Sequence, residues 1–258
     1  MVQSLFDLTG KTALVTGSTK GIGKAIAQRM AECGANVVVS SRKEDACIAV
    51  ADEINANGGT AHPIACNINY KEQLEALVDG ANKTFGQIDI LVCNAAVNPF
   101  FGASQEIPDS AFEKILGANI MSNHWLCQMT IPQMAERKDG VVIIISSIGG
   151  VKGSKNLGAY CISKAADMQM ARNLAVEWGP SNVRINAIAP GLIKTDFARA
   201  LWENPEIYER TTRQAPLRRI GDPDEIAGMA IYLASSAGSF TTGQTICIDG
   251  GVTISEGG

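Results

Sequence analysis

Seven short runs in this chain are apolar at successive positions rather than at every second one. They fall at residues 12–16, 36–41, 60–66, 88–93, 141–146, 183–189 and 245–250. A strand that is apolar on both sides must be covered on both faces, which is typical of parallel strands packed between helices. Amphipathic segments separate most of the runs, so the chain is predicted to be an α/β protein with a doubly wound, seven-stranded parallel sheet.

The segments between the strands predict the helices that cover this sheet. A first helix is expected at residues 22–34, a long one at about 109–136, a second long one at about 156–178, and another at 224–236. Residues 190–223 are expected to be irregular. The 258 residues contain no linker, repeat or low-complexity segment, which predicts one domain over residues 1–258 with a single-domain Rossmann fold.

Composition argues against several classes of function. The formal charge is −4 and no dense Lys/Arg run occurs, so nucleic acid is not an expected partner. Seven cysteines without a C-x-x-C pair, and only two histidines, predict neither a disulfide framework nor a metal site. The first residues lack the pattern of a signal peptide and no run is long enough to span a membrane, so we expect a cytoplasmic protein without membrane contact.

A glycine-rich turn follows the first predicted strand directly and precedes the first predicted helix. Glycines allow a tight turn, and the amino end of a helix offers free N–H groups to a phosphate. A turn of this kind can also be a turn and nothing more, but its position between a strand and a helix favours dinucleotide binding. The predicted contacts are Gly17, Ser18, Thr19, Lys20, Gly21, Ile22 and Gly23.

Basic residues near the second strand indicate which dinucleotide is bound. This strand ends at Ser41 and Arg42 with no carboxylate, whereas NAD-binding domains usually carry an acidic residue there. A guanidinium pairs well with a 2′-phosphate, and Lys20 could reach the same group. The alternative is two solvated basic side chains. The pattern predicts NADP(H), with Ser41 and Arg42 at the phosphate.

A tyrosine and a lysine four residues apart supply the reacting groups. Tyr160 and Lys164 share one face of the second long helix, and Ser147 ends the fifth strand. Free tyrosine titrates near 10, and a nearby ammonium should lower the pKa of Tyr160 toward the working pH. Ser147 could hydrogen-bond a carbonyl oxygen. Ser146 is its rival for that role.

These motifs, in this order, resemble the short-chain dehydrogenase/reductase family, with T-G-x-x-x-G-I-G in the turn and Y-x-x-x-K after the serine. The resemblance covers nearly the whole chain. It implies hydride transfer between NADP(H) and a small carbonyl or alcohol substrate, with Tyr160 as general acid–base. It also implies that Asn119 holds a water linking Lys164 to solvent. The family's enoyl reductases space their tyrosine and lysine further apart.

The resemblance implies further cofactor contacts, with two departures from the usual pattern. Asn67 and Ile68 replace a more common Asp-Val pair, and Cys93 and Ala96 replace residues of the usual N-N-A-G signature. The implied contacts are Asn67 and Ile68 with adenine, Asn94 and Ala95 in the loop after the fourth strand, and Pro190, Gly191, Ile193 and Thr195 along the nicotinamide.

The substrate is less constrained than the reaction. A lid is expected at about residues 195–214, containing Leu201 and Trp202, and residues 98–101 could form another wall. Residues 94–102 and 189–195 resemble NADPH-dependent carbonyl reductases that also act as retinol dehydrogenases. Cys161, inside the tyrosine motif, packs or confers thiol sensitivity.

Two other functions stay open. One is a β-ketoacyl-[acyl-carrier-protein] reductase, for which Lys138 could be a basic residue near the mouth, although Ser181 weakens docking. The other is a non-catalytic binding protein on the same fold. The resemblance also implies a homotetramer formed through the two long helices and the last strand.

Overall fold

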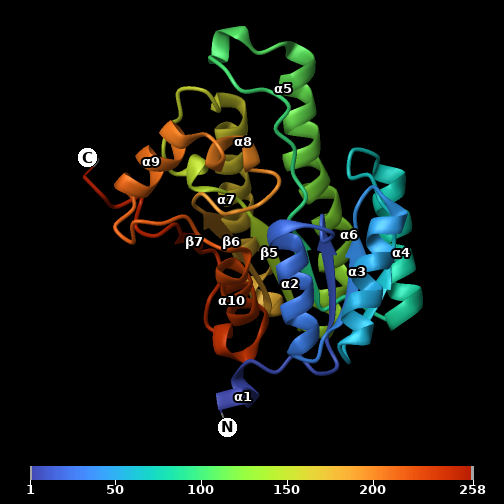
Figure 1. Cartoon of the computed structure of the whole chain (residues 1–258). Helices are drawn as coiled ribbons and strands as arrows, with labels where there is room; N and C mark the ends of the chain where they lie inside the picture. Colours follow the sequence, from blue (N-terminus) through green and yellow to red (C-terminus); the bar gives the residue numbers. More distant parts are fainter. Residues whose placement is uncertain (1, 257–258) are drawn as a thin grey trace.

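All seven predicted strands form, and they run parallel in one sheet with the order β3-β2-β1-β4-β5-β6-β7 (Figure 1). The computed structural model describes residues 2–256. The first and last residues of the predicted domain, 1 and 258, therefore lie outside the described residues. The predicted fold class is confirmed. The strands are β1 (Thr12–Thr16), β2 (Asn36–Ser40), β3 (Thr60–Pro63), β4 (Ile90–Cys93), β5 (Gly140–Ile145), β6 (Val183–Pro190) and β7 (Thr245–Ile248).

Helices cover both faces of the sheet. The α-helices are α1 (Val2–Leu5), α2 (Gly21–Glu32), α3 (Glu44–Ala56), α4 (Lys71–Phe85), α5 (Asp109–Leu116), α6 (Ser122–Arg137), α7 (Gly158–Trp178), α8 (Arg199–Trp202), α9 (Pro205–Gln214) and α10 (Pro223–Ala234). Short helical turns are η1 (Ser104–Glu106), η2 (Gly117–Met121), η3 (Ile148–Gly150), η4 (Gly179–Ser181) and η5 (Ser236–Gly238). Within residues 2–256 no helix has the length and apolarity that a bilayer span requires.

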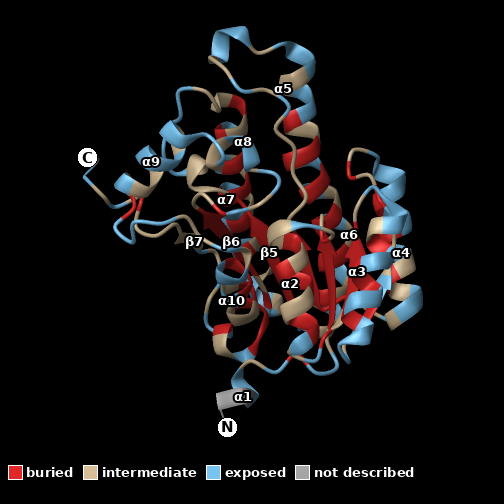
Figure 2. Ribbon diagram, viewed as in Figure 1, coloured by how far each residue is buried: buried red, intermediate tan, exposed pale blue. Residues whose placement is uncertain are grey.

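The strands are apolar on both sides because the sheet has a hydrophobic core on each face. Ala13 and Val15 of β1 pack with residues of α2, α3 and α10, whereas Leu14 between them packs with residues of α4, α6 and α7. Successive side chains of a strand point to opposite faces, so one strand contributes to both cores. In Figure 2 the buried sheet lies between helices whose outer sides are exposed.

The order of the strands determines where a ligand can bind. The chain winds outward from β1 to β3 on one side, and then from β4 to β7 on the other. At such a reversal the loops after neighbouring strands diverge and leave a crevice at the carboxyl ends of the strands. The loops after β1, β4, β5 and β6 carry most of the predicted site residues.

Two expectations about the helices need correction. The long helix predicted at about 109–136 is divided by η2, a π-helical turn, into α5 and α6. Residues 190–223, expected to be irregular, contain α8 and α9. Asn204 caps α9 by accepting a hydrogen bond from the Ile207 N–H (3.1 Å), and Pro205 follows at the first helical position. An Asn-Pro pair is a typical helix start, but it was missed here because many charged residues surround it.

Candidate active site

The glycine-rich turn joins β1 to α2 and leaves the amino end of that helix open. Gly17 and Gly21 have φ of +66° and +51°, in the left-handed region that favours glycine. Lys20 precedes α2 at the capping position without a side-chain capping bond, and the first turn of the helix contains no acidic residue. The first amide groups of α2 are therefore available to an anion, which is the property that a pyrophosphate requires.

The third glycine of the turn is required for close packing rather than for its backbone angles. A Cβ on Gly23 would lie 2.4 Å from the Asn94 amide nitrogen and 2.4 Å from the Gly17 carbonyl oxygen. Asn94 itself donates hydrogen bonds from Nδ2 to the carbonyls of Thr16 (2.8 Å) and Gly17 (3.2 Å). The turn is thus held against the end of β4 with no space for a side chain.

Gly23→Ala should therefore lower stability and weaken dinucleotide binding. Overpacking of this kind costs about 1–3 kcal/mol, and a domain of this size loses about 2–4 °C of Tm per kcal/mol. Thermal unfolding and an NADPH titration would measure both effects. Gly228→Ala is the matched control, because Gly228 lies inside α10 with nothing within 4 Å of its added Cβ. Gly228→Ala should not lower Tm, because alanine is favoured over glycine inside a helix. If Gly23→Ala does not lower Tm either, the packing argument is wrong.

The residues predicted to bind the adenosine end of the dinucleotide differ in how many hydrogen bonds and ion pairs they already make within the protein. Ser18 is buried: its hydroxyl donates to the Val15 carbonyl (2.7 Å) and accepts from the Ser40 N–H (2.8 Å). Ser41 contacts the Cys47 thiol through its hydroxyl (3.3 Å). Arg42 is exposed and makes no ion pair within residues 2–256. Its guanidinium is free to meet a phosphate.

Lys20 and the residues after β3 also lie around this end of the site. The Lys20 ammonium is exposed and pairs with the Asp196 carboxylate at 3.1 Å. Asn67 orients its own loop, because its side-chain oxygen accepts from the side-chain amide of Asn69 (2.8 Å). Ile68 is buried beside it, with 8 % of its surface exposed.

The segment after β6 lies against the glycine turn. Pro190 ends the strand, and a Cβ on Gly191 would lie 2.8 Å from the Asp249 Cα. Ile193 is buried, and a Cβ on Gly21 would lie 2.9 Å from the Thr195 methyl carbon. The segment predicted to hold the pyrophosphate and the segment predicted to hold the nicotinamide are thus in contact.

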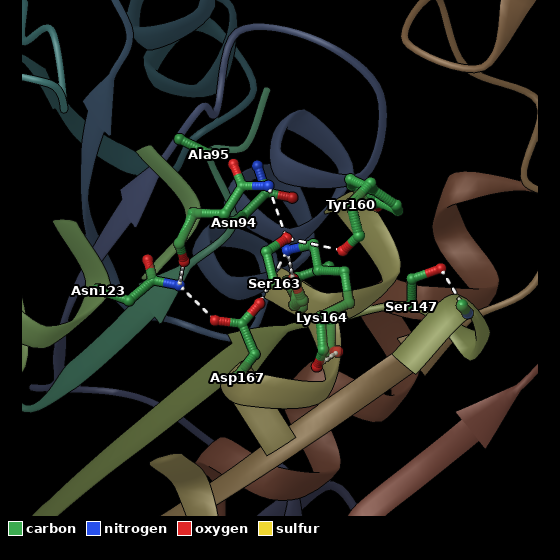
Figure 3. Close-up of polar contacts among 12 residues, drawn as sticks. Asn94, Ala95, Asn123, Ser147, Tyr160, Ser163, Lys164 and Asp167 are labelled. Carbon is green, nitrogen blue, oxygen red and sulfur yellow. Dashed lines mark hydrogen bonds and ion pairs between the residues drawn. The ribbon is translucent and has the colours of Figure 1, made fainter. Parts of the chain in front are cut away.

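Ser147, Tyr160 and Lys164 meet at the carboxyl end of β5 and the first turns of α7 (Figure 3). The Lys164 Nζ lies 5.7 Å from the centre of the Tyr160 ring. It donates hydrogen bonds to the Ile145 carbonyl and to the Asp167 carboxylate, both at 2.9 Å. One turn of helix therefore brings a charged ammonium beside the phenol, as the spacing predicted.

The electrostatics of Tyr160 differ from the expectation. Burial raises the pKa of Tyr160 more than the Lys164 ammonium and a hydrogen bond with Ser147 lower it, so the pKa lies above its usual 10. The predicted lowering by Lys164 is present, but the net direction was wrong for the chain by itself. Sequence spacing reveals the neighbouring charge and not the desolvation that opposes it. The phenol is therefore protonated at neutral pH.

The two serines after β5 point in different directions. The Ser146 hydroxyl is buried and donates to the Lys164 carbonyl at 2.7 Å, so it connects β5 to α7. The Ser147 hydroxyl accepts from the Gly149 N–H at 3.1 Å, and its proximity to Tyr160 lowers the pKa of that phenol. This geometry favours Ser147 over Ser146 as the residue that faces a substrate.

Asn119 lies in the π-helical turn η2 and its side chain is fully buried. It accepts from the Val97 N–H (2.8 Å) and donates to the Ser163 hydroxyl (3.0 Å). Its backbone carbonyl accepts from the Asn123 side chain at 2.7 Å. Asn119 thus holds the loop after β4 against α7. Hydrogen bonds through Asn123 and Asp167 link the Asn119 carbonyl to the Lys164 ammonium.

Several residues of the site escaped the sequence-based prediction. The Asp167 carboxylate accepts from the Lys164 ammonium and from the Asn123 side-chain amide. The Thr16 hydroxyl accepts from the N–H groups of Asn94 (3.0 Å) and Ala95 (3.1 Å). A signal for Asp167 existed, because residues three apart on a helix share a face and this one follows Lys164 at that spacing.

Apolar side chains form a wall beside Tyr160. Phe100 and Asn98 line a small cavity with the Tyr160 ring, and the Phe197 ring lies 6.3 Å from the Tyr160 ring between centroids. The Trp202 indole N–H donates to the Thr195 carbonyl at 2.8 Å, which connects α8 to the segment after β6. The predicted lid thus begins beside the reacting groups.

Comparison with known proteins shows the family of this chain. A family model described as enoyl-(acyl carrier protein) reductase matches residues 17–253. Dehydrogenase/reductase SDR family member 4 of Bos taurus is 42 % identical over 95 % of this chain and 88 % of its own length. The chain belongs to the short-chain dehydrogenase/reductase family. Its members share the oxidoreductase class to which this chain is therefore assigned.

Solved structures of the short-chain dehydrogenase/reductase family superpose closely on the chain. A 7α-hydroxysteroid dehydrogenase complexed with NADH and 7-oxo glycochenodeoxycholic acid is 38 % identical, with a TM-score of 0.93 and 96 % of each chain covered. A gluconate 5-dehydrogenase from Burkholderia cenocepacia in complex with NADP and tartrate is 29 % identical, with a TM-score of 0.94, covering 98 % of this chain and 99 % of that one. Similar proteins thus bind either nicotinamide dinucleotide.

Proposed function

We propose that this chain is an NADP(H)-dependent oxidoreductase that interconverts a ketone or aldehyde with the corresponding alcohol. The observation that carries the proposal is the meeting of Ser147, Tyr160 and Lys164 at the sheet edge that also bears the glycine-rich turn. A phenol beside an ammonium is a proton donor and acceptor, and the open end of α2 fits a pyrophosphate.

The residues have separable roles in the proposed reduction. When bound, NADPH supplies the hydride that the carbonyl carbon accepts. Ser147 donates a hydrogen bond to the carbonyl oxygen and Tyr160 transfers its proton to that oxygen, which leaves a phenolate. Lys164 stabilises this phenolate through its positive charge. Burial keeps Tyr160 protonated before the reaction, because it raises the pKa of the phenol. Alcohol oxidation uses the same groups in reverse.

The preference for NADP(H) rests on charge around the adenosine end. Arg42 is exposed and unpaired within the described chain, and Lys20 lies in the turn one strand away. Both would meet a 2′-phosphate, for which a guanidinium supplies paired donors. The remaining contacts are proposed for Asn67 and Ile68 with adenine, Asn94 and Ala95 beside the cofactor, and Ile193 and Thr195 with the carboxamide.

Apolar surroundings of Tyr160 support a substrate with hydrophobic bulk. Phe100 and Phe197 flank the phenol, and the lid helices α8 and α9 follow directly. The position of Lys138 disfavours the β-ketoacyl reductase, because this residue follows α6 just before β5 begins, at the edge of the sheet opposite Tyr160. The non-catalytic alternative is disfavoured, since the chain retains Ser147, Tyr160 and Lys164.

A substrate panel tests this proposal. Simple ketones, diketones, retinoids and acetoacetyl thioesters would be incubated with NADPH or NADH, and cofactor oxidation followed by absorbance. We expect turnover of apolar carbonyls with NADPH as the better cofactor. Turnover of the thioesters alone would favour the carrier-protein reductase, and no turnover of any carbonyl or alcohol would contradict the proposed reaction. A cytoplasmic location stays a prediction.

We also propose a homotetramer formed through the long helices and the last strand. Ile162 and Val176 of α7 are 55 % and 81 % exposed, and Phe240, shortly before β7, is fully exposed. Val176→Lys should therefore reduce the mass measured by size-exclusion chromatography with light scattering. Ile48→Lys, at an exposed apolar position on α3, should leave the mass unchanged. A monomeric unmodified chain would exclude the tetramer.

A further inference from the structure

The buried carboxylate of Asp167 forms an ion pair with the Lys164 ammonium. Neither side chain reaches solvent, because the exposed fractions of Lys164 and Asp167 are 2 % and 0 %. One carboxylate oxygen of Asp167 accepts from the Lys164 ammonium at 2.9 Å, and the other accepts from the Asn123 side-chain amide at 3.0 Å (Figure 3). Both oxygens are engaged, so the carboxylate has a defined orientation toward the lysine.

Asn123 is itself held in place. Its side-chain nitrogen also donates to the Asn119 carbonyl at 2.7 Å, in the π-helical turn η2. An unbroken series of hydrogen bonds therefore runs from the backbone of η2 through Asn123 and Asp167 to Lys164. We call Asn123 and Asp167 the lysine clamp. It joins α6 to α7 at the point where the proposed proton transfer takes place.

We propose that Asp167 is a positioning residue that holds the charged ammonium of Lys164 beside Tyr160. This inference rests on the proposed function of Tyr160 and Lys164, and extends it by naming what keeps the lysine charged and directed. Burying an ammonium without a partner is unfavourable, and a neutral amine would not stabilise a phenolate. Asp167 supplies that partner and Asn123 keeps it in position.

The charges around Lys164 support this role. Burial lowers the pKa of Lys164, but the attraction of Asp167 and Tyr160 opposes burial, so the net pKa is raised. Asp167 also raises the pKa of Tyr160. The groups facing the ammonium are Tyr160 and Asp167 from α7, Cys93 from β4, Asn123 from α6 by way of Asp167, and the Ile145 carbonyl from β5.

The sign of the pH effect follows from one removed negative charge. Tyr160 and Lys164 titrate as a coupled pair, and alcohol oxidation requires the pair to have lost one proton but not two. The negative charge of Asp167 raises the pKa of both Tyr160 and Lys164. Its removal therefore lowers the pH at which the pair loses its first proton and the pH at which it loses its second. Asp167→Asn should therefore move the acidic and the alkaline limbs of the kcat/KM profile to lower pH. A merely structural role would lower the rate at all pH values without moving the limbs.

A second readout does not depend on activity. In the Tyr160→Phe background Lys164 titrates without its phenol partner, and its Cε signal can be followed by NMR with ¹³C-labelled lysine, assigned through Lys164→Met. Adding Asp167→Asn should lower the pKa of Lys164 by about 1–3 units, the usual effect of a close opposite charge. Asp89→Asn, at another buried carboxylate far along the chain, should change neither the profile nor this titration.

These outcomes separate the two proposals. An unchanged Lys164 titration, or a pH profile whose limbs stay in place, would overturn the role of Asp167. A shifted titration in a protein that turns over no substrate would instead contradict the proposed reaction and leave the lysine clamp supported. If Asp167→Asn does not fold, Asp167→Ser removes the same charge with less bulk and is expected to give the same downward shift.

Discussion

Tyr160→Phe should lower kcat for carbonyl reduction by about 10²–10⁴-fold, the range that a well-placed general acid contributes. Phenylalanine keeps the ring that packs beside Lys164 and Phe197 but has no proton to give. NADPH binding should be nearly unchanged, because the proposed dinucleotide contacts come from other segments. Steady-state kinetics and an NADPH titration by fluorescence would measure the two quantities on the same preparation.

Tyr232→Phe is the matched control for this substitution. Tyr232 lies on α10 and its hydroxyl contacts the Thr241 hydroxyl at 2.9 Å, on a part of the chain that bears none of the proposed reacting groups. Its loss should cost about 1 kcal/mol of stability and leave kcat unchanged. Near-normal turnover by Tyr160→Phe would mean that another group supplies the proton.

Arg42→Asp should reverse the preference between the two dinucleotides. A hydrogen bond to a charged group contributes about 1.5–3 kcal/mol, which corresponds to roughly 10- to 150-fold in kcat/KM. Reversing the charge adds repulsion of the 2′-phosphate, so we expect a loss of about 10²-fold or more with NADPH. With NADH the new carboxylate can accept from the ribose 2′-hydroxyl, and kcat/KM should be kept or improved.

The control for Arg42→Asp makes the same kind of charge change elsewhere. Lys83→Asp places a carboxylate in the last turn of α4, at the opposite edge of the sheet from the open end of α2. Lys83→Asp should have only a small effect on kcat/KM, and this effect should be the same with NADPH and with NADH. If unmodified protein already prefers NADH, or if Arg42→Asp affects NADPH and NADH alike, the 2′-phosphate is recognised by other groups. Lys20 is the first of these to test, although its ammonium already pairs with Asp196.

The sequence predicted what depends on local pattern. Runs of apolar residues located every strand, and the conformational freedom of glycine located the turn after β1. Helical periodicity alone placed Tyr160 and Lys164 on one face. Each of these depends on residues that are close together along the chain, so one sequence was sufficient to find them.

The features that were missed depend on which side chains the fold brings together. Asn123 and Asp167 lie on different helices, and nothing near either residue in the sequence indicates their contact. The raised pKa of Tyr160 comes mainly from burial, which only the packed structure determines. The helix α9 was overlooked for a different reason, since charged and polar residues predominate over Pro205–Gln214 and obscured its start at Asn204 and Pro205.

The π-helical turn η2 has a consequence for the alignment of the two halves of its helical rod. A π turn holds more residues than an α turn, so it offsets the phase of every residue that follows it. If the same residues 117–121 formed a regular α-helix instead, every position after them would be rotated by about 100° relative to α5. Asn123 would then turn away from α7, although every residue that contacts Lys164 would be the same. The π-helical turn thus sets the rotation of α6 about its axis, and this rotation directs Asn123 toward Asp167 of α7.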